Sequence, residues 1–82
     1  MLVARLRAVV AEVLGLEPKE LSPAISLGDE LAVDSLDLVE MAIAVEDAMA
    51  VRLPEDLLAS VRTYGDLETL VVMSRVPGRR LP

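Results

Sequence analysis

The fold of this chain is decided by the stretch DSLDLVEMAIAVEDAM, residues 34–49. It opens with two residue types that cap helix N-termini and continues with apolar residues at helical spacing. Either Asp34 or Ser35 can cap the helix, and Asp37 favours the positive end of the helix dipole. We therefore predict a helix over residues 35–49.

This predicted helix has two apolar faces. The broad arc that we expect to face the core contains Leu38, Met41, Ala42, Val45 and Met49. A second strip consists of Leu36, Val39 and Ile43, and acids rim it on both sides, Glu40 and Asp47 on one and Glu46 on the other. An apolar centre with a charged edge is typical of a docking surface. The alternative is that the strip packs beneath the long loop or the third helix.

One helix is predicted upstream of this stretch. Residues 2–14 carry apolar side chains at helical spacing, namely Leu2, Leu6, Val9, Val10, Val13 and Leu14. Gly15 can end this helix in the left-handed conformation. Residues 16–34 then form a long connection, which apolar side chains can anchor to the core. These are Leu16, Leu21, Ile25, Leu27 and Leu31.

Two helices are predicted downstream. Residues 54–60 form a short third helix, and Pro54 suits its first position. Thr63 and Asp66 resemble a capping box that opens a fourth helix over about residues 64–75. The inward side chains of this helix are Leu67, Leu70 and Val71.

The chain is thus predicted to be an all-α, four-helix bundle with three longer helices, a short third helix and a long first loop. Its 82 residues allow one domain, which we place at residues 1–75, followed by a flexible tail at 76–82. Because Tyr64 is the single aromatic residue, the core must be aliphatic. No apolar run approaches the roughly 18 residues of a membrane span, so we expect no membrane association.

The net charge of −6 argues against nucleic acid as a partner. Between Asp29 and Val51 the chain carries seven acids and no base: Asp29, Glu30, Asp34, Asp37, Glu40, Glu46 and Asp47. This asymmetry predicts basic partners, although an acidic face can also serve solubility alone. The absence of cysteine from so small a domain fits an intracellular, cytoplasmic protein.

Ser35 is poorly equipped to act as a nucleophile by itself. The chain has no histidine and no cysteine, and its one lysine, Lys19, lies in another segment. A serine nucleophile normally needs an adjacent base. The acids match no calcium-binding loop, so no metal site is expected. We therefore predict that the protein is not an enzyme and that another enzyme modifies Ser35.

The stretch LAVDSLDLVEM, residues 31–41, resembles the signature around the modified serine of the acyl carrier protein family. The resemblance continues through VED at 45–47, RLPE at 52–55 and VRTYGDL at 61–67, and it covers roughly residues 2–75. It implies that Ser35 carries 4′-phosphopantetheine, installed by a phosphopantetheinyl transferase. The arm would hold acyl groups as thioesters, and the protein would shuttle them between enzymes of fatty-acid or polyketide biosynthesis.

The resemblance also implies roles for the neighbours of Ser35. Asp34 would shape the attachment site. Acyltransferases, ketosynthases and other basic-faced pathway enzymes would contact seven residues: Leu36, Asp37, Val39, Glu40, Ile43, Glu46 and Asp47. The carrier would act as a monomer. We further expect an acyl chain to enter between the second and third helices, where Leu57, Leu58 and Val61 would line the far side.

Some residues depart from the family pattern. Ala32 stands where the family often has glycine, and Leu38 and Met49 also differ, so we infer no acyl chain length. Peptidyl carriers usually show a Gly-Gly-x-Ser entry, which residues 32–35 lack. A peptidyl or aminoacyl carrier, a carrier excised from a synthase, and an unmodified acidic helical module remain the alternatives.

Overall fold

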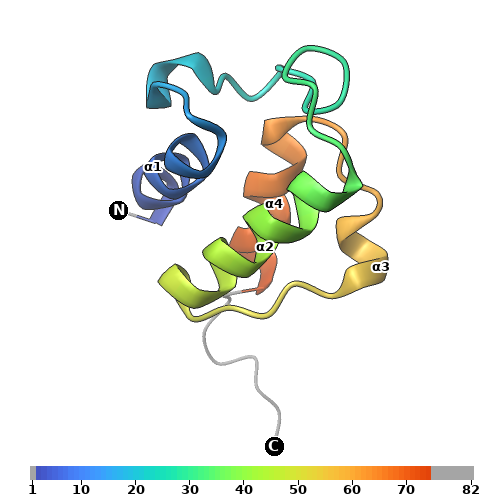
Figure 1. Ribbon diagram of the computed structural model, residues 1–82. Coiled ribbons are helices and arrows are strands. Elements are labelled where there is room, and N and C mark those ends of the chain that lie inside the picture. The colour runs from blue at the N-terminus through green and yellow to red at the C-terminus, as the bar shows by residue number, and fades with distance from the viewer. Residues whose placement is uncertain (1, 75–82) are drawn as a thin grey trace, which may run out of the picture.

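The computed structural model describes residues 2–74 and shows four α-helices (Figure 1). They are α1 (Leu2–Leu14), α2 (Ser35–Met49), α3 (Glu55–Leu58) and α4 (Tyr64–Ser74), with a short 3₁₀ turn, η1 (Pro18–Glu20), after α1. Within the described residues, the only strand-like pairing is an isolated bridge between Ser26 and Thr63. The all-α prediction, with three longer helices and a short third one, is confirmed. The predicted flexible tail, residues 76–82, lies outside the described residues.

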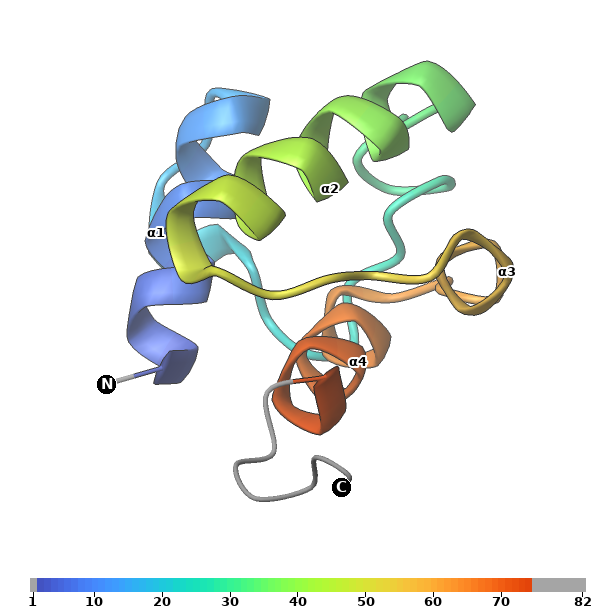
Figure 2. The same cartoon turned by 90° about the horizontal axis from the view of Figure 1, so that it is seen from below.

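Helix α2 crosses the molecule in Figure 1 and packs against α1. Both α1 and α4 border the core. Helix α1 also contacts η1 and α4, and α3 contacts α4. Figure 2 shows the segment after α2 running back beneath that helix to reach α3, which is seen end on. The N-terminal end of α2 therefore lies on the same side of the molecule as α3, and this side holds the site described below.

The core is aliphatic apart from one tyrosine, as the composition predicts. Its buried side chains are Leu6, Val10, Ala11, Leu21, Leu27, Met41, Ala42, Val45, Met49, Leu53, Leu58, Tyr64, Leu67 and Val71. The predicted inner arc of α2 is buried except at Leu38, which is half-buried. Not every apolar residue of α1 is buried: the buried face runs through Leu6, Val10 and Ala11, and Val13 is 40% exposed.

Helix boundaries follow the local signals closely. Gly15 adopts a φ of 71° and ends α1 as predicted. Before α4, the Asp66 N–H donates to Thr63 Oγ1 at 3.1 Å, and the Asp66 carboxylate accepts from the Thr63 N–H at 3.1 Å. Backbone N–H groups of Thr63 and Arg62 donate to this carboxylate and hold the pKa of Asp66 below its usual value. The capping box expected from the sequence is therefore present.

The predicted third helix, 54–60, is too long. The observed helix is Glu55–Leu58, and Pro54 is its N-cap, with an extended ψ of 137°, rather than its first residue. At the other end, the Val61 N–H donates to the Leu58 carbonyl at 3.0 Å, so the chain turns away instead of continuing the helix.

A polar contact fastens α1 to α4. Arg7 Nη2 lies 3.0 Å from Glu68 Oε2, and the Arg7 guanidinium carbon lies 5.5 Å from the centroid of the Tyr64 ring. Burial raises the pKa of the Tyr64 hydroxyl to about 12, so this group is neutral at physiological pH. Within residues 2–74 this is the one ion pair. No acid of α2 is therefore paired with a base from the described part of the chain.

Candidate functional site

Ser35 is the first residue of α2 and is exposed. The residue before it is the N-cap: Asp34 has extended backbone, and its Oδ1 accepts from the Asp37 N–H at 2.8 Å. In return, Asp37 Oδ2 accepts from the Asp34 N–H at 3.2 Å. The sequence allowed either Asp34 or Ser35 as the cap, and the structure assigns that role to Asp34. The Ser35 hydroxyl is thereby left outside the cap and open to solvent.

The loop before Ser35 is tied to the start of α4. The Leu27 N–H donates to the Arg62 carbonyl at 3.0 Å, and the Val33 N–H donates to the Leu27 carbonyl at 2.8 Å. Ala32 between them has a φ of 56°, in the left-handed region that glycine adopts without strain. This non-glycine conformation costs about 1–2 kcal/mol. The hydrogen bonds hold the strained turn and so fix where α2 begins.

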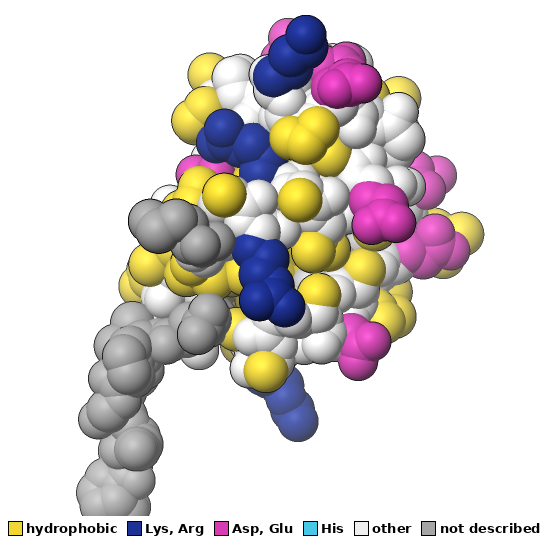
Figure 3. All heavy atoms as spheres, turned by 90° about the vertical axis from the view of Figure 1, so that its left-hand side faces the viewer, with side chains coloured by type: hydrophobic (Ala, Val, Ile, Leu, Met, Phe, Trp, Pro, Cys, Tyr) yellow, Lys and Arg dark blue, Asp and Glu magenta, His cyan; other side chains and the backbone are white. Residues whose placement is uncertain are grey.

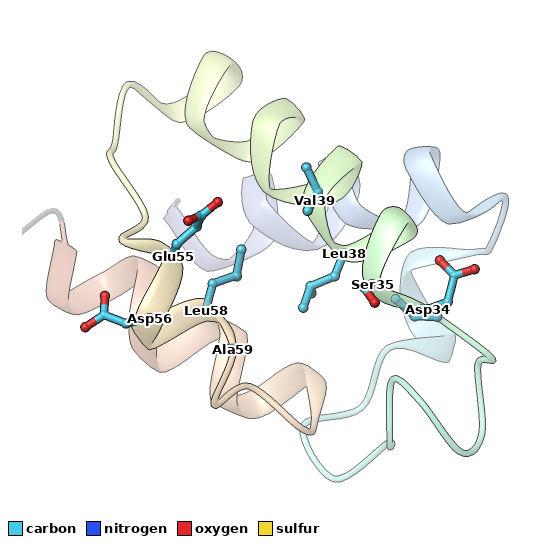
Figure 4. A pocket seen from close by; sticks show the side chains of 9 residues that line it. Asp34, Ser35, Leu38, Val39, Glu55, Asp56, Leu58 and Ala59 are labelled. Carbon is cyan, nitrogen blue, oxygen red and sulfur yellow. The ribbon is translucent and has the colours of Figure 1, made fainter.

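A hollow of about 660 Å³ opens beside Ser35, between α2 and α3. It is lined by Val33, Asp34, Ser35, Leu38, Val39, Glu55, Asp56, Leu58 and Ala59. In Figure 4, Leu38 and Leu58 point into the space between the two helices, while Glu55 and Asp56 lie at the end away from Ser35. The floor of this hollow is apolar and its rim is acidic. A hollow therefore lies between α2 and α3, where we expect an acyl chain to enter.

Two of the three residues predicted to line the far side, Leu57 and Val61, do not line this hollow. Leu57 is 50% exposed and borders a different one, between α3 and α4. Consecutive residues of a helix point about 100° apart, so Leu57 and Leu58 cannot both face α2. Val61 lines an adjoining hollow together with Leu38.

The outer apolar strip of α2 is exposed. Leu36 is 66%, Val39 45% and Ile43 59% accessible to solvent. The alternative that the strip packs beneath the long loop or α3 is thus not what the structure shows. An apolar strip left uncovered on a small domain is a feature of surfaces that bind other molecules.

The four acids of the candidate partner surface fall into two groups. Glu40 and Asp47 are exposed, without a partner in the described part of the chain. Asp37 belongs to the cap of α2, and Glu46 Oε2 accepts from the Leu53 N–H at 2.7 Å. Sequence reasoning missed both of these hydrogen bonds. The Asp-x-x-Asp spacing at 34–37 could have indicated the first, but no local signal marks the second, whose partner is seven residues away.

Charge is distributed unevenly over the surface. Figure 3, which faces the α1 side, shows Lys and Arg side chains down the middle of the view and most Asp and Glu side chains at the top and along the right-hand edge. Among residues 2–74, no cluster of three or more potential ligands is arranged to hold a metal ion. In the same part of the chain, no helix is long and apolar enough to cross a membrane.

Comparison with known proteins finds a family match over most of the chain. Residues 4–71 match the family described as "Phosphopantetheine attachment site". The chain is 40% identical over 70 residues to the meromycolate extension acyl carrier protein of Mycobacterium leprae, covering 85% of this chain and 61% of that protein. It is 42% identical over 66 residues to the protein of the same name from Mycolicibacterium smegmatis, covering 80% and 67%.

A third relative carries a more general name. The acyl carrier protein of Rhodococcus erythropolis is 42% identical over 66 residues, covering 80% of this chain and 72% of that protein. The chain therefore spans about three-fifths to three-quarters of the length of these three relatives.

Proposed function

The chain belongs to the phosphopantetheine attachment-site family, which includes the acyl carrier proteins, and from this premise we propose that it carries acyl groups on an arm attached to Ser35. The observation that carries the proposal is the position of this serine. It begins α2 with its hydroxyl outside the helix cap, beside an apolar hollow. The family implies 4′-phosphopantetheine as the cofactor, and the relatives named above are acyl carrier proteins. We propose the same of this chain.

The residues around Ser35 suit this attachment. A phosphodiester at the first residue of a helix meets free backbone N–H groups and the positive end of the dipole. The arm's terminal thiol supplies thioester chemistry to a chain that contains no cysteine. Because no histidine is present, we propose that a base of the transferase removes the proton of the Ser35 hydroxyl. Asp34 holds the end of α2 in place through its bond to Asp37.

The attachment is tested by intact mass. Incubated with coenzyme A and a phosphopantetheinyl transferase, the protein should gain the mass of one arm. The Ser35→Ala variant should gain nothing, whereas the matched control Ser60→Ala, another exposed serine, should be loaded like the wild type. A gain that persists in Ser35→Ala would overturn the assignment. No gain in any of the three proteins would favour the unmodified acidic module.

The hollow between α2 and α3 supports a place for the acyl chain. Its apolar lining includes Leu38, Val39 and Leu58, close to the attachment point (Figure 4). NMR spectra of the arm-loaded form with and without a mid-length acyl group would test this. Methyl resonances of these three residues should shift when the acyl group is added. If only the neighbours of Ser35 in sequence respond, the chain stays outside.

The outer strip of α2 is the proposed docking surface for pathway enzymes. We propose that the partners are the transferase and the acyltransferases and ketosynthases of fatty-acid or polyketide synthesis. We also propose that the carrier is a monomer and acts in the cytoplasm, where coenzyme A is available. Reversing Glu40 and Asp47 to lysine should slow association with such an enzyme and flatten its salt dependence, because exposed charges steer encounter. Ile43→Ala should instead speed dissociation. Unchanged rates in both variants would place the interface elsewhere.

A further inference from the structure

A second hollow, of about 600 Å³, lies next to the first, between α2 and the segment that leads to α3. Its lining is mostly apolar and comes from Val39, Ala42, Ile43, Leu53, Pro54 and Leu58, with Glu46, Arg52 and Glu55 as the charged residues. Val39 and Leu58 also line the hollow beside Ser35. A side chain bound in the second hollow would therefore adjoin the hollow beside Ser35, at the end away from the attachment site.

Arg52 is the exceptional charge of this region. From Asp29 to Asp56 the chain carries nine acids and a single base, Arg52. Arg52 is exposed and makes no ion pair with any of residues 2–74. The surrounding field attracts basic surfaces, yet a basic group placed opposite Arg52 would meet a like charge.

The backbone that carries Arg52 is held in place. The adjacent residue, Leu53, is buried, and its N–H donates to Glu46 Oε2 at 2.7 Å. A charge on an anchored segment loses little freedom when it pairs, so it is better suited to fix an orientation than one on a mobile loop. Glu46 thus acts here as a positioning residue.

We infer that this second hollow receives an apolar side chain of a basic-faced partner protein, and that a carboxylate next to that side chain pairs with Arg52 and sets the orientation of docking. The inference rests on the proposed carrier function and deepens it. Charge complementarity supports it: most of the partner surface must be basic to match the acids, but the position facing Arg52 must be acidic. A uniformly basic partner would leave Arg52 opposed by its own sign.

Charge reversal at Arg52 separates this inference from general electrostatics. Arg52→Glu makes the protein two charges more negative, so long-range attraction alone predicts tighter binding to a basic partner. The inference predicts the opposite, about three- to tenfold weaker binding, since a surface ion pair is replaced by repulsion. The matched control is Lys19→Glu, which makes the same charge change at an exposed residue of η1. It should bind as tightly as wild type or tighter.

The probes are the phosphopantetheinyl transferase and a β-ketoacyl synthase from the same organism, with dissociation constants measured by calorimetry. Weakening in Arg52→Glu alone, for at least one probe, supports the inference. Reversing the facing carboxylate of that probe to lysine should restore binding. Binding of Arg52→Glu equal to or tighter than that of Lys19→Glu, for both probes, overturns it.

Loading of Ser35, measured by intact mass on the same samples, distinguishes this failure from failure of the carrier function. A wild-type protein that is loaded normally keeps the carrier function even if the Arg52 result is negative. A wild-type protein that is never loaded removes the carrier function and this inference together. Thermal melts of both variants should match the wild type, because both side chains are exposed.

Discussion

The two apolar faces of α2 have similar chemistry and opposite surroundings. On the inner face, Met41 and Val45 are fully buried. On the outer face, Leu36 and Ile43 are more than half exposed. Burial of the inner face stabilises the fold, whereas the exposed outer face contributes no such stabilisation. The difference indicates that the outer strip is kept apolar for a reason other than folding, and the predictions below test that separation.

The largest effect should come from truncating each face in turn. Met41→Ala removes a fully buried side chain and should lower the free energy of unfolding by about 2–5 kcal/mol. Ile43→Ala, on the exposed face, should change it by no more than about 0.5 kcal/mol. Urea denaturation followed by circular dichroism measures both. Equal losses would mean that the outer strip also belongs to the core.

Removal of a half-buried acid of α2 should likewise lower the free energy of unfolding more than removal of an exposed one. Glu46→Ala removes the acceptor of the Leu53 N–H and should cost about 1–2 kcal/mol, because a charge-assisted bond is lost at a half-buried position. Asp47→Ala, its exposed neighbour, should be neutral or slightly stabilising, since it relieves repulsion among acids. Urea denaturation of the two variants is again the measurement. A costly Asp47→Ala would show that this residue has a structural partner.

The inner face, but not every contact around it, could be predicted from the sequence. The bounds of α2 and its two faces follow from the spacing of apolar residues along the chain. This spacing does not depend on how the rest of the chain packs. The bond from Leu53 to Glu46 could not be predicted, because it depends on how the chain returns after the helix ends. Leu57 was misplaced because a helix of four residues is too short for its sequence to define a face.

The site shows the same limit. The position of Ser35 at the start of α2 was predicted, because serine and aspartate at a helix start are a local pattern. The choice of Asp34 over Ser35 as the cap was made by the reciprocal hydrogen bonds of the structure, although the Asp-x-x-Asp spacing at 34–37 could have indicated it. The roles proposed for the outer strip and for Ser35 depend on partners and stay predictions until they are measured.

Strain at the C-terminal end of α2 should give a smaller effect. Ala50 caps the helix with a φ of 55°, where glycine is favoured. Ala50→Gly should therefore raise the free energy of unfolding by about 0.5–1 kcal/mol. The matched control is Ala48→Gly, inside the helix, which should lower it by a similar amount. If both variants lose stability in urea, the left-handed cap is not maintained in solution.

The smallest effect should come from screening the exposed acids. Glu40 and Asp47 have no ion-pair partner within residues 2–74, so they contribute repulsion without compensation. Added salt screens such repulsion, with a Debye length of about 3 Å at 1 M. The melting temperature should therefore rise by a few degrees between low salt and 0.5 M NaCl. This rise corresponds to a gain in the free energy of unfolding on the order of 1 kcal/mol or less. In the double variant Glu40→Gln, Asp47→Asn the starting melting temperature should be higher and the response to salt smaller. Calorimetric melts at several NaCl concentrations measure both quantities.

A wild-type melting temperature that does not change with salt would mean that the acids of the outer face are already compensated. The charge of this face would then not lower the stability of the fold.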